Sequence, residues 1–424
     1  MDDHTGMTTN ARSRAPLSIA YLVFVALLVS FFAGYLLHEG AASAAHGDLT
    51  VFHIPAFKTI ESKPLAQALQ SYSSATTPLF HLLSVYGPFR YDQPSYGVAS
   101  TLLCVAAVGV FALLLAKRFG FQPEHRPAIL LFAAVLLVSP YYRTQAFWPS
   151  TDNMATALTL LTLLSLAWME SDTKHPLLCF LGAALASALT FYTRQNFLWL
   201  IAYVALVLLL RGTIHRAWVL IFVPLMIPAV ALFRLWHGLT PPRFQQHHEG
   251  LALEGVAFIF FSILFAAIPF LAAQPHAVSA YFRSRGSWVP DLSFGLLFLL
   301  LKLLTTPSPF YTGGELIVSG IIIKMLDFTG KAEPFLYSLL VIAGAAVASH
   351  LFRQVNWQSR ALMVLLIGSA IMIRVSFQRY YDPLLLIVFL GAFDRAYLRR
   401  HFTTRAAAYT LILETGMWIA KAIH

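Results

Sequence analysis

Two carboxylates, Glu39 and Asp48, follow the first long apolar run of the chain, Leu17–Leu37. A hydroxyl that attacks the anomeric carbon of a sugar must lose a proton, and a positioned carboxylate is the usual acceptor. Because phosphate leaves without a strong acid, one such base is enough for an inverting transfer. Asp48 is favoured because it lies deeper in the loop and near His53, whereas Glu39 stands where the helix ends. The alternative is that both acids only solvate the loop.

Two basic clusters stand at the ends of later apolar runs. One is Arg194–Gln195–Asn196, and the other contains Arg374, Arg379 and Tyr380. Guanidinium and amide groups suit a phosphate or sugar hydroxyls, so an arginine pair here could neutralise a polyprenyl phosphate. The alternatives are arginines that extend to the membrane interface and an interfacial belt of Arg and Tyr.

Histidines next to acids raise the question of a metal. His53 lies near Asp48, and His247 and His248 precede Glu249. Their spacing matches no zinc signature, and adjacent histidines diverge. We therefore expect no metal and no other cofactor, and interpret these residues either as ligands of substrate hydroxyls or as an ordinary polar loop. Phosphate-binding and nucleotide-binding motifs are also missing from the sequence, which favours a donor that is itself a membrane lipid.

The elements that must position these residues are membrane helices. The chain is 58% hydrophobic and only 11% charged, against about a quarter charged in soluble domains. Apolar runs long enough to cross a bilayer recur from end to end. We expect these runs to be helices, because backbone polar groups in lipid must form their hydrogen bonds within the segment. The predicted fold is an all-α integral membrane protein, a polytopic bundle of about 11–13 transmembrane helices.

The whole chain, 1–424, is predicted to form one membrane domain. A first external loop over 38–94 would carry short interfacial helices, and 305–334 would form a long external segment. Arg12 and Arg14 precede the first run and place the N-terminus in the cytoplasm. The net charge of +10 comes from basic residues scattered through short loops. This distribution indicates that the lipid bilayer is the partner of the chain and excludes nucleic acid as a partner. The lack of glycosylation sequons favours a bacterial inner membrane, with the site facing the periplasm.

Five short motifs occur in the same order as in a known family. They are Phe52–Pro55 (FHIP), Thr76–Pro78 (TTP), Arg194–Asn196 (RQN), His248–Glu249 (HE) and Phe377–Tyr380 (FQRY). The chain thereby resembles the eukaryotic α-1,2-glucosyltransferases that add the last glucose to the dolichyl-diphosphate oligosaccharide, within the C-type superfamily of polytopic glycosyltransferases. It departs from them in one respect that matters. The family's acidic pair directly precedes FHIP, whereas only Asp48 stands here, four residues before Phe52, so Glu39 stays an alternative base.

The resemblance implies a membrane glycosyltransferase that moves a sugar from a polyprenyl-phosphate donor, with inversion. The sugar would be a hexose such as glucose, and the acceptor a lipid-linked glycan or another envelope component. Asp48 or Glu39 would be the base. The donor phosphate would be held by Arg194, Gln195, Arg374 and Arg379. Substrate would be bound by His53, Thr76, Thr77, Asn196, His248, Glu249 and Tyr380.

Two other classes of protein remain open. A transporter or flippase for a lipid-linked or anionic substrate predicts charges in the middle of spans and inverted repeats. A scaffold subunit of an envelope complex would need no external cluster of acid and arginine. The charges here stand at span ends on one side, which favours an enzyme.

Overall fold

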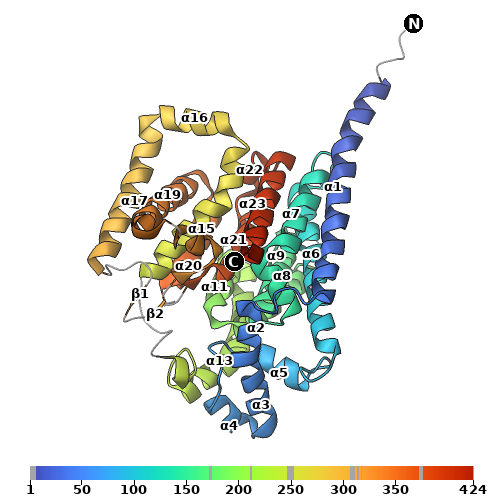
Figure 1. Cartoon of the computed structure of the whole chain (residues 1–424), viewed down its shortest axis with the longest axis vertical. Coiled ribbons are helices and arrows are strands. Elements are labelled where there is room, and N and C mark those ends of the chain that lie inside the picture. Colours follow the sequence, from blue (N-terminus) through green and yellow to red (C-terminus); the bar gives the residue numbers. More distant parts are fainter. Residues whose placement is uncertain are drawn as a thin grey trace.

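A computed structural model gives the structure of the chain and describes residues 6–170, 174–210, 213–245, 253–305, 311–312, 315–316, 318–327, 329–371 and 376–423. Within these residues almost every element is a helix (Figure 1).

The α-helices of the first half are α1 (Gly6–Leu36), α2 (Ala44–Asp48), α3 (Ile54–Ser62), α4 (Leu65–Gln70), α5 (Leu79–Tyr86), α6 (Ser95–Phe119), α7 (Arg126–Val138), α8 (Pro140–Phe147), α9 (Thr151–Glu170), α10 (Pro176–Thr193) and α11 (Leu198–Leu209). Those of the second half are α12 (Thr213–Trp218), α13 (Phe222–Trp236), α15 (Leu253–Ala272), α16 (Pro275–Arg283), α17 (Arg285–Thr305), α18 (Ile321–Asp327), α19 (Glu333–Gln354), α20 (Trp357–Ile371), α21 (Leu384–Ala392), α22 (Arg395–Arg399) and α23 (Thr404–Ile423).

Short turns and strands connect the helices. One π-helical segment, η1, spans Leu49–His53, and the 3-10 turns are η2 (Gln195–Phe197), η3 (Val219–Ile221), η4 (Pro242–Phe244), η5 (Gly330–Ala332) and η6 (Gln378–Tyr380). The two-residue strands are β1 (Tyr311–Thr312), β2 (Glu315–Leu316), β3 (Val318–Ser319) and β4 (Ser376–Phe377). Strand β1 pairs with β2 antiparallel, and β3 pairs with β4 in parallel.

The prediction of a polytopic, all-helical membrane protein is confirmed. In the described ranges, seven helices are long and apolar enough to cross a membrane, namely α1 from Pro16, α6, α10, α12 to α13 from Arg216, α15, α17 from Trp288, and η5 with α19. The pair α7 and α8, bent by 59°, makes an eighth if counted as one span. Two shorter apolar helices cover Gln195–Leu209 and Trp357–Ile371.

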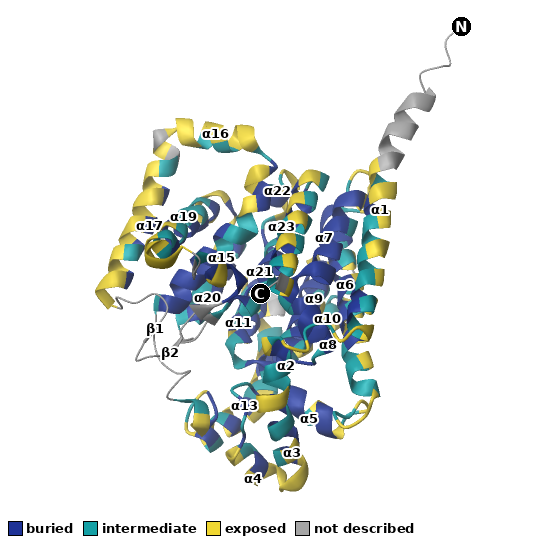
Figure 2. Cartoon of the chain, in the orientation of Figure 1, coloured by how far each residue is buried: buried dark blue, intermediate teal, exposed yellow. Residues whose placement is uncertain are grey.

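The helices divide into a buried centre and a lipid-facing shell. Helix α10 lies along α9, α23 lies against α7 and α15, and α19 lies against both α15 and α17. Figure 2 shows α1 and α17 on the outer edges, with many exposed side chains. On α1 these include Leu22, Val29 and Leu36. Apolar side chains exposed along a helix of this length are expected to contact the hydrocarbon core of the bilayer.

The segment after α1 forms a small helical unit at one end of the bundle. Helix α2, the π segment η1 and helix α3 follow one another without a break, and α4 and α5 lie beside them (Figure 1). A separate core holds the unit together, with Phe57, Ile60 and Tyr72 buried against Trp236 of α13. The segment 38–94 therefore contains short helices, whereas their interfacial placement and the external location of 38–94 and of 305–334 stay predictions.

Candidate active site

Stretches far apart in the sequence meet where this small unit touches the bundle. Arg379 on η6 forms an ion pair with Asp48, the last residue of α2, although 331 positions separate them. Arg194, just after α10, forms a second ion pair with Asp152 in the first turn of α9. The second oxygen of Asp152 accepts a hydrogen bond of 2.9 Å from Gln145, which fixes the carboxylate.

The ring of Tyr380 connects the two ion pairs. The guanidinium carbon of Arg194 lies 4.3 Å from the ring centre, and that of Arg379 lies 5.7 Å from it. Such distances give a favourable cation–π contact. Arg194 also interacts electrostatically with both Arg379 and Asp48. Two arginines, a carboxylate and an aromatic ring that the sequence predicted as site residues therefore form one cluster.

Arg379 keeps hydrogen-bond donors that its partner does not use. A guanidinium group has five N–H donors, and in the described part of the chain the buried Nε of Arg379 has no hydrogen-bond partner. The side chain is 18% exposed and that of Asp48 is 24% exposed, so both can be reached from outside. A guanidinium group with spare donors in a partly closed site is suited to a phosphate oxygen.

His53, the last residue of the π segment, lies beside this cluster. Its Nδ1 is 2.9 Å from Nε2 of His81, and the Nδ1 of His81 is 2.5 Å from the Tyr72 hydroxyl. Burial, followed by the positive charges of Arg379 and Arg194, lowers the pKa of His53 to about 3. His53 is therefore neutral at physiological pH. Sequence analysis missed His81 and Tyr72, and the signal for His81 was a histidine within the apolar run that follows Pro78.

Acidification is expected to destabilise the protein through His53. An unfolded histidine binds its proton near pH 6.5, whereas folded His53 binds one only near pH 3. Between these values the unfolded state holds more protons, so the free energy of unfolding falls as the pH decreases through this window. Thermal unfolding between pH 7.5 and 4.5 measures the effect, and His53→Gln should reduce the slope. An equal slope in the variant and the wild type would contradict the assignment.

The predicted site residues near Thr77 tie the loop to the bundle. Gln195 accepts a hydrogen bond from the Thr77 amide (3.1 Å) and donates one to the Ala75 carbonyl (2.7 Å). The Thr77 hydroxyl donates to the Phe191 carbonyl of α10 (2.7 Å), and Thr76 pairs with Ser74. These contacts fix the residues that directly precede α5, the helix that carries His81. Asn196 is half-buried beside them, and the substrate roles predicted for this group stay predictions.

Glu39, the alternative base, occupies a different place. Its carboxylate accepts hydrogen bonds of 2.8 and 2.9 Å from Arg143 Nε and one of 2.9 Å from Trp418 Nε1. Arg143 is buried and lies over the Trp418 ring at 4.6 Å. Trp148 also donates to the Glu39 backbone carbonyl. The carboxylate is engaged on both oxygens, which favours Asp48 as the group that acts on a substrate.

Three predicted site residues, Arg374, His248 and Glu249, lie outside the described residues. Within the described ranges, no three His, Cys, Asp or Glu side chains form a group that could hold a metal ion.

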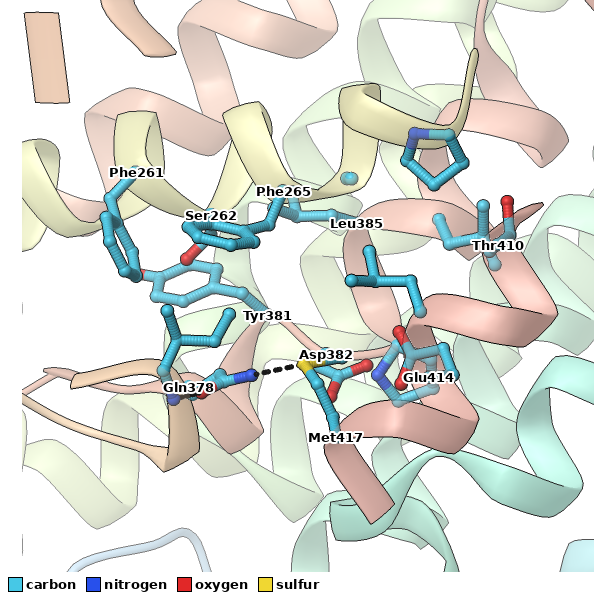
Figure 3. A pocket seen from close by; sticks show the side chains of 16 residues that line it. Phe261, Ser262, Phe265, Gln378, Tyr381, Asp382, Leu385, Thr410, Glu414 and Met417 are labelled. Atoms are coloured by element: carbon cyan, nitrogen blue, oxygen red, sulfur yellow. Dashed lines mark hydrogen bonds between the residues drawn. The ribbon is translucent and has the colours of Figure 1, made fainter. Parts of the chain in front are cut away.

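A cavity extends from η6 into the bundle. It lies between α15, α21 and α23, with Phe261 and Phe265 on its apolar walls (Figure 3) and Leu413 beside them. Gln378, next to Arg379, lines it and donates to the sulfur of Met417. The carboxyl groups of Asp382 and Glu414 lie at its polar end. The chain neighbours of Arg379 and Tyr380, Gln378 and Tyr381, thus line a mainly apolar recess, whereas the residues of the ion-pair cluster do not line it.

Comparisons with known proteins add one structural likeness. No family model and no curated protein matches the chain. A crystal structure of ArnT from Cupriavidus metallidurans in the apo state is similar over 89% of this chain and 78% of that chain, with 14% sequence identity and a TM-score of 0.34. The likeness to the α-1,2-glucosyltransferases therefore rests on the short motifs alone, and what the site does is argued from its own residues.

Proposed function

We propose that this chain is a membrane glycosyltransferase of the C-type superfamily, which moves a hexose from a polyprenyl-phosphate donor to a lipid-linked glycan or another envelope acceptor. The observation that carries the proposal is the meeting of Asp48, Arg379, Arg194, Tyr380 and His53 at one place. A base, two cations and a neutral imidazole are the groups that such a transfer needs.

The arginines hold the phosphate of the donor. Each arginine is paired with a carboxylate, and Arg379 keeps spare donors. The phosphodiester of a lipid-linked sugar carries one negative charge, and the departing polyprenyl phosphate carries two. Because charge develops on the phosphate during the reaction, fixed cations stabilise the transition state more than the ground state.

Asp48 removes the proton from the acceptor hydroxyl. The hydroxyl oxygen forms a bond to the anomeric carbon while the bond from that carbon to the phosphate oxygen breaks, and the phosphate leaves with the electron pair. Protonation cancels the charge of Asp48 as the phosphate gains a charge, so Arg379 can turn from one to the other. Direct displacement inverts the anomeric centre, and a β-linked donor gives an α-linked product.

The membrane domain around the site supports a lipid donor. The cluster belongs to a membrane-spanning bundle, and Gln378 and Tyr381, the chain neighbours of Arg379 and Tyr380, line a recess with apolar walls. Arg12 and Arg14 before the first span support a site that faces the periplasm of a bacterial inner membrane.

The test uses purified protein in lipid nanodiscs with radiolabelled polyprenyl-phosphate glucose or mannose and an extract of envelope acceptors. We expect the label to pass into an acceptor and free polyprenyl phosphate to appear in equal amount. If no lipid-linked hexose is consumed, while the protein moves such lipids across a vesicle bilayer, the enzyme assignment is wrong and a flippase takes its place.

A further inference from the structure

A buried chain of three side chains ends at the ion-pair cluster. Tyr72, His81 and His53 are joined end to end by the two short contacts described above, and all three are almost completely buried. Tyr72 is stacked on Trp236 with ring centres 6.0 Å apart and planes 10° apart. The Trp236 indole in turn donates to the Leu69 carbonyl at 2.8 Å. The far end of the chain is therefore fixed to α13.

The near end is fixed as well. The ring of His53 lies 5.4 Å from that of Phe80 and 6.5 Å from that of Phe57. Its Nδ1 faces His81, so the remaining nitrogen, Nε2, has no hydrogen-bond partner among the described residues. The positive charges of Arg379 and Arg194 act on this ring. His53 therefore presents one unused nitrogen beside the two proposed phosphate ligands.

The direction of the hydrogen bonds decides what that nitrogen can do. Burial lowers the pKa values of His53 and His81, so both imidazoles are neutral, and each has one N–H donor and one acceptor nitrogen. Burial also raises the pKa of Tyr72, whose hydroxyl therefore keeps its proton. Ser74 and Thr76 supply hydroxyl hydrogen bonds to the Tyr72 oxygen. Tyr72, whose phenol is a stronger acid than a neutral imidazole N–H, then donates to His81 Nδ1. His81 Nε2–H donates onward to His53 Nδ1, which places the hydrogen of His53 on Nε2.

We propose that Tyr72 and His81 are positioning residues that hold His53 as the Nε2–H tautomer, and that this N–H donates to a phosphate oxygen of the lipid-linked donor. His53 is a third phosphate ligand that adds no charge to a site whose arginines already supply two. The inference rests on the proposed function, because it names the group that His53 contacts.

The experiment compares donor KM and kcat in three variants. An asparagine amide can replace Nδ1 of a histidine, whereas a glutamine amide reaches the place of Nε2. We expect His53→Asn to raise the KM for polyprenyl-phosphate hexose by about 10- to 100-fold, the range for a hydrogen bond to a charged group, and His53→Gln to restore most of the loss. Tyr72→Phe keeps the ring on Trp236 and removes only the hydroxyl, and it should raise KM in the same direction.

A double variant separates positioning from general support of the fold. In the His53→Gln background the donor no longer depends on a tautomer, so adding Tyr72→Phe should change KM no further. A Tyr72→Phe effect of equal size in both backgrounds would overturn the inference, as would an equal KM in His53→Asn and His53→Gln. If Tyr72→Phe does not fold, the His53 pair still decides.

Failure of the proposed function would look different. Wild-type protein would then neither consume polyprenyl-phosphate hexose nor bind sugar-free polyprenyl phosphate, measured by quenching of tryptophan fluorescence in nanodiscs, and the inference would fall with it. Active wild type with unresponsive Tyr72 and His53 variants overturns the inference alone.

Discussion

Asp48→Asn is expected to lower the rate of sugar transfer by about 10²- to 10⁴-fold, the contribution of a general base. The amide keeps the size of the side chain but cannot accept the proton of the acceptor hydroxyl. It also ends the ion pair with Arg379, which leaves that guanidinium free for the phosphate. We therefore expect kcat to fall while the KM for the donor stays constant or decreases. Initial rates with a radiolabelled donor measure both.

Asp92→Asn provides the matched control. Asp92 belongs to the same segment after the first span, but its carboxylate is half-exposed and pairs with Arg90 at the surface. Its loss should leave transfer unchanged. The base assignment would be refuted by an Asp48→Asn enzyme that keeps the wild-type kcat, and a loss confined to Glu39→Gln would move the base to Glu39.

Arg143→Met is expected to lower the free energy of unfolding by about 3 kcal/mol. Removing one partner of a buried ion pair costs about 3–5 kcal/mol, and the lower end applies because Glu39 is still 24% exposed. Methionine retains most of the length of arginine, so the loss comes from the broken ion pair, the lost hydrogen bonds to the carbonyls of Leu137 and Ser30, and the lost contact with Trp418. Unfolding in mixed micelles titrated with a denaturing detergent gives the free energy.

Arg90→Met is the control for this effect. Arg90 pairs with Glu61 and Asp92, but all three side chains are well exposed, and exposed pairs stabilise little. If Arg90→Met lowered the free energy of unfolding as much as Arg143→Met, the detergent assay would be responding to the loss of any positive charge and not to the buried ion pair. No loss in Arg143→Met would mean that the Glu39–Arg143 contact does not hold α1 to α8.

The bundle could be predicted because its signal is local. Each predicted span is a run of apolar residues. In lipid, a helix satisfies all backbone hydrogen bonds of such a run within the run itself, so its formation does not depend on the rest of the chain. Asp48, Arg194 and Arg379 could also be singled out from the sequence as candidates, because charged residues at the ends of membrane spans are costly without a partner or a function.

The partners of these residues could not be predicted, because partner choice is a property of the tertiary structure. Nothing in the sequence near Glu39 indicates that Arg143 will neutralise it, and nothing near Arg194 selects Asp152. The same holds for Gln195, whose type suggests a ligand for phosphate, although in the folded chain its amide holds the loop at Ala75 and Thr77. His81 and Tyr72 could be recognised as neighbours of His53 only in the folded chain, where hydrogen bonds join the three side chains.

The contact between Asp48 and Arg379 has a consequence for biosynthesis. The two residues are 331 positions apart, so the ribosome makes the acid long before it makes the cation. Every intermediate helix must be inserted, and η6 must reach α2, before the two charges can meet. A nascent chain that ends before Arg379 contains the base but lacks this cation of the site. Under the proposed function, the site is therefore complete only after the chain has been made as far as Arg379, and a shorter nascent chain is expected not to transfer sugar from the lipid-linked donor.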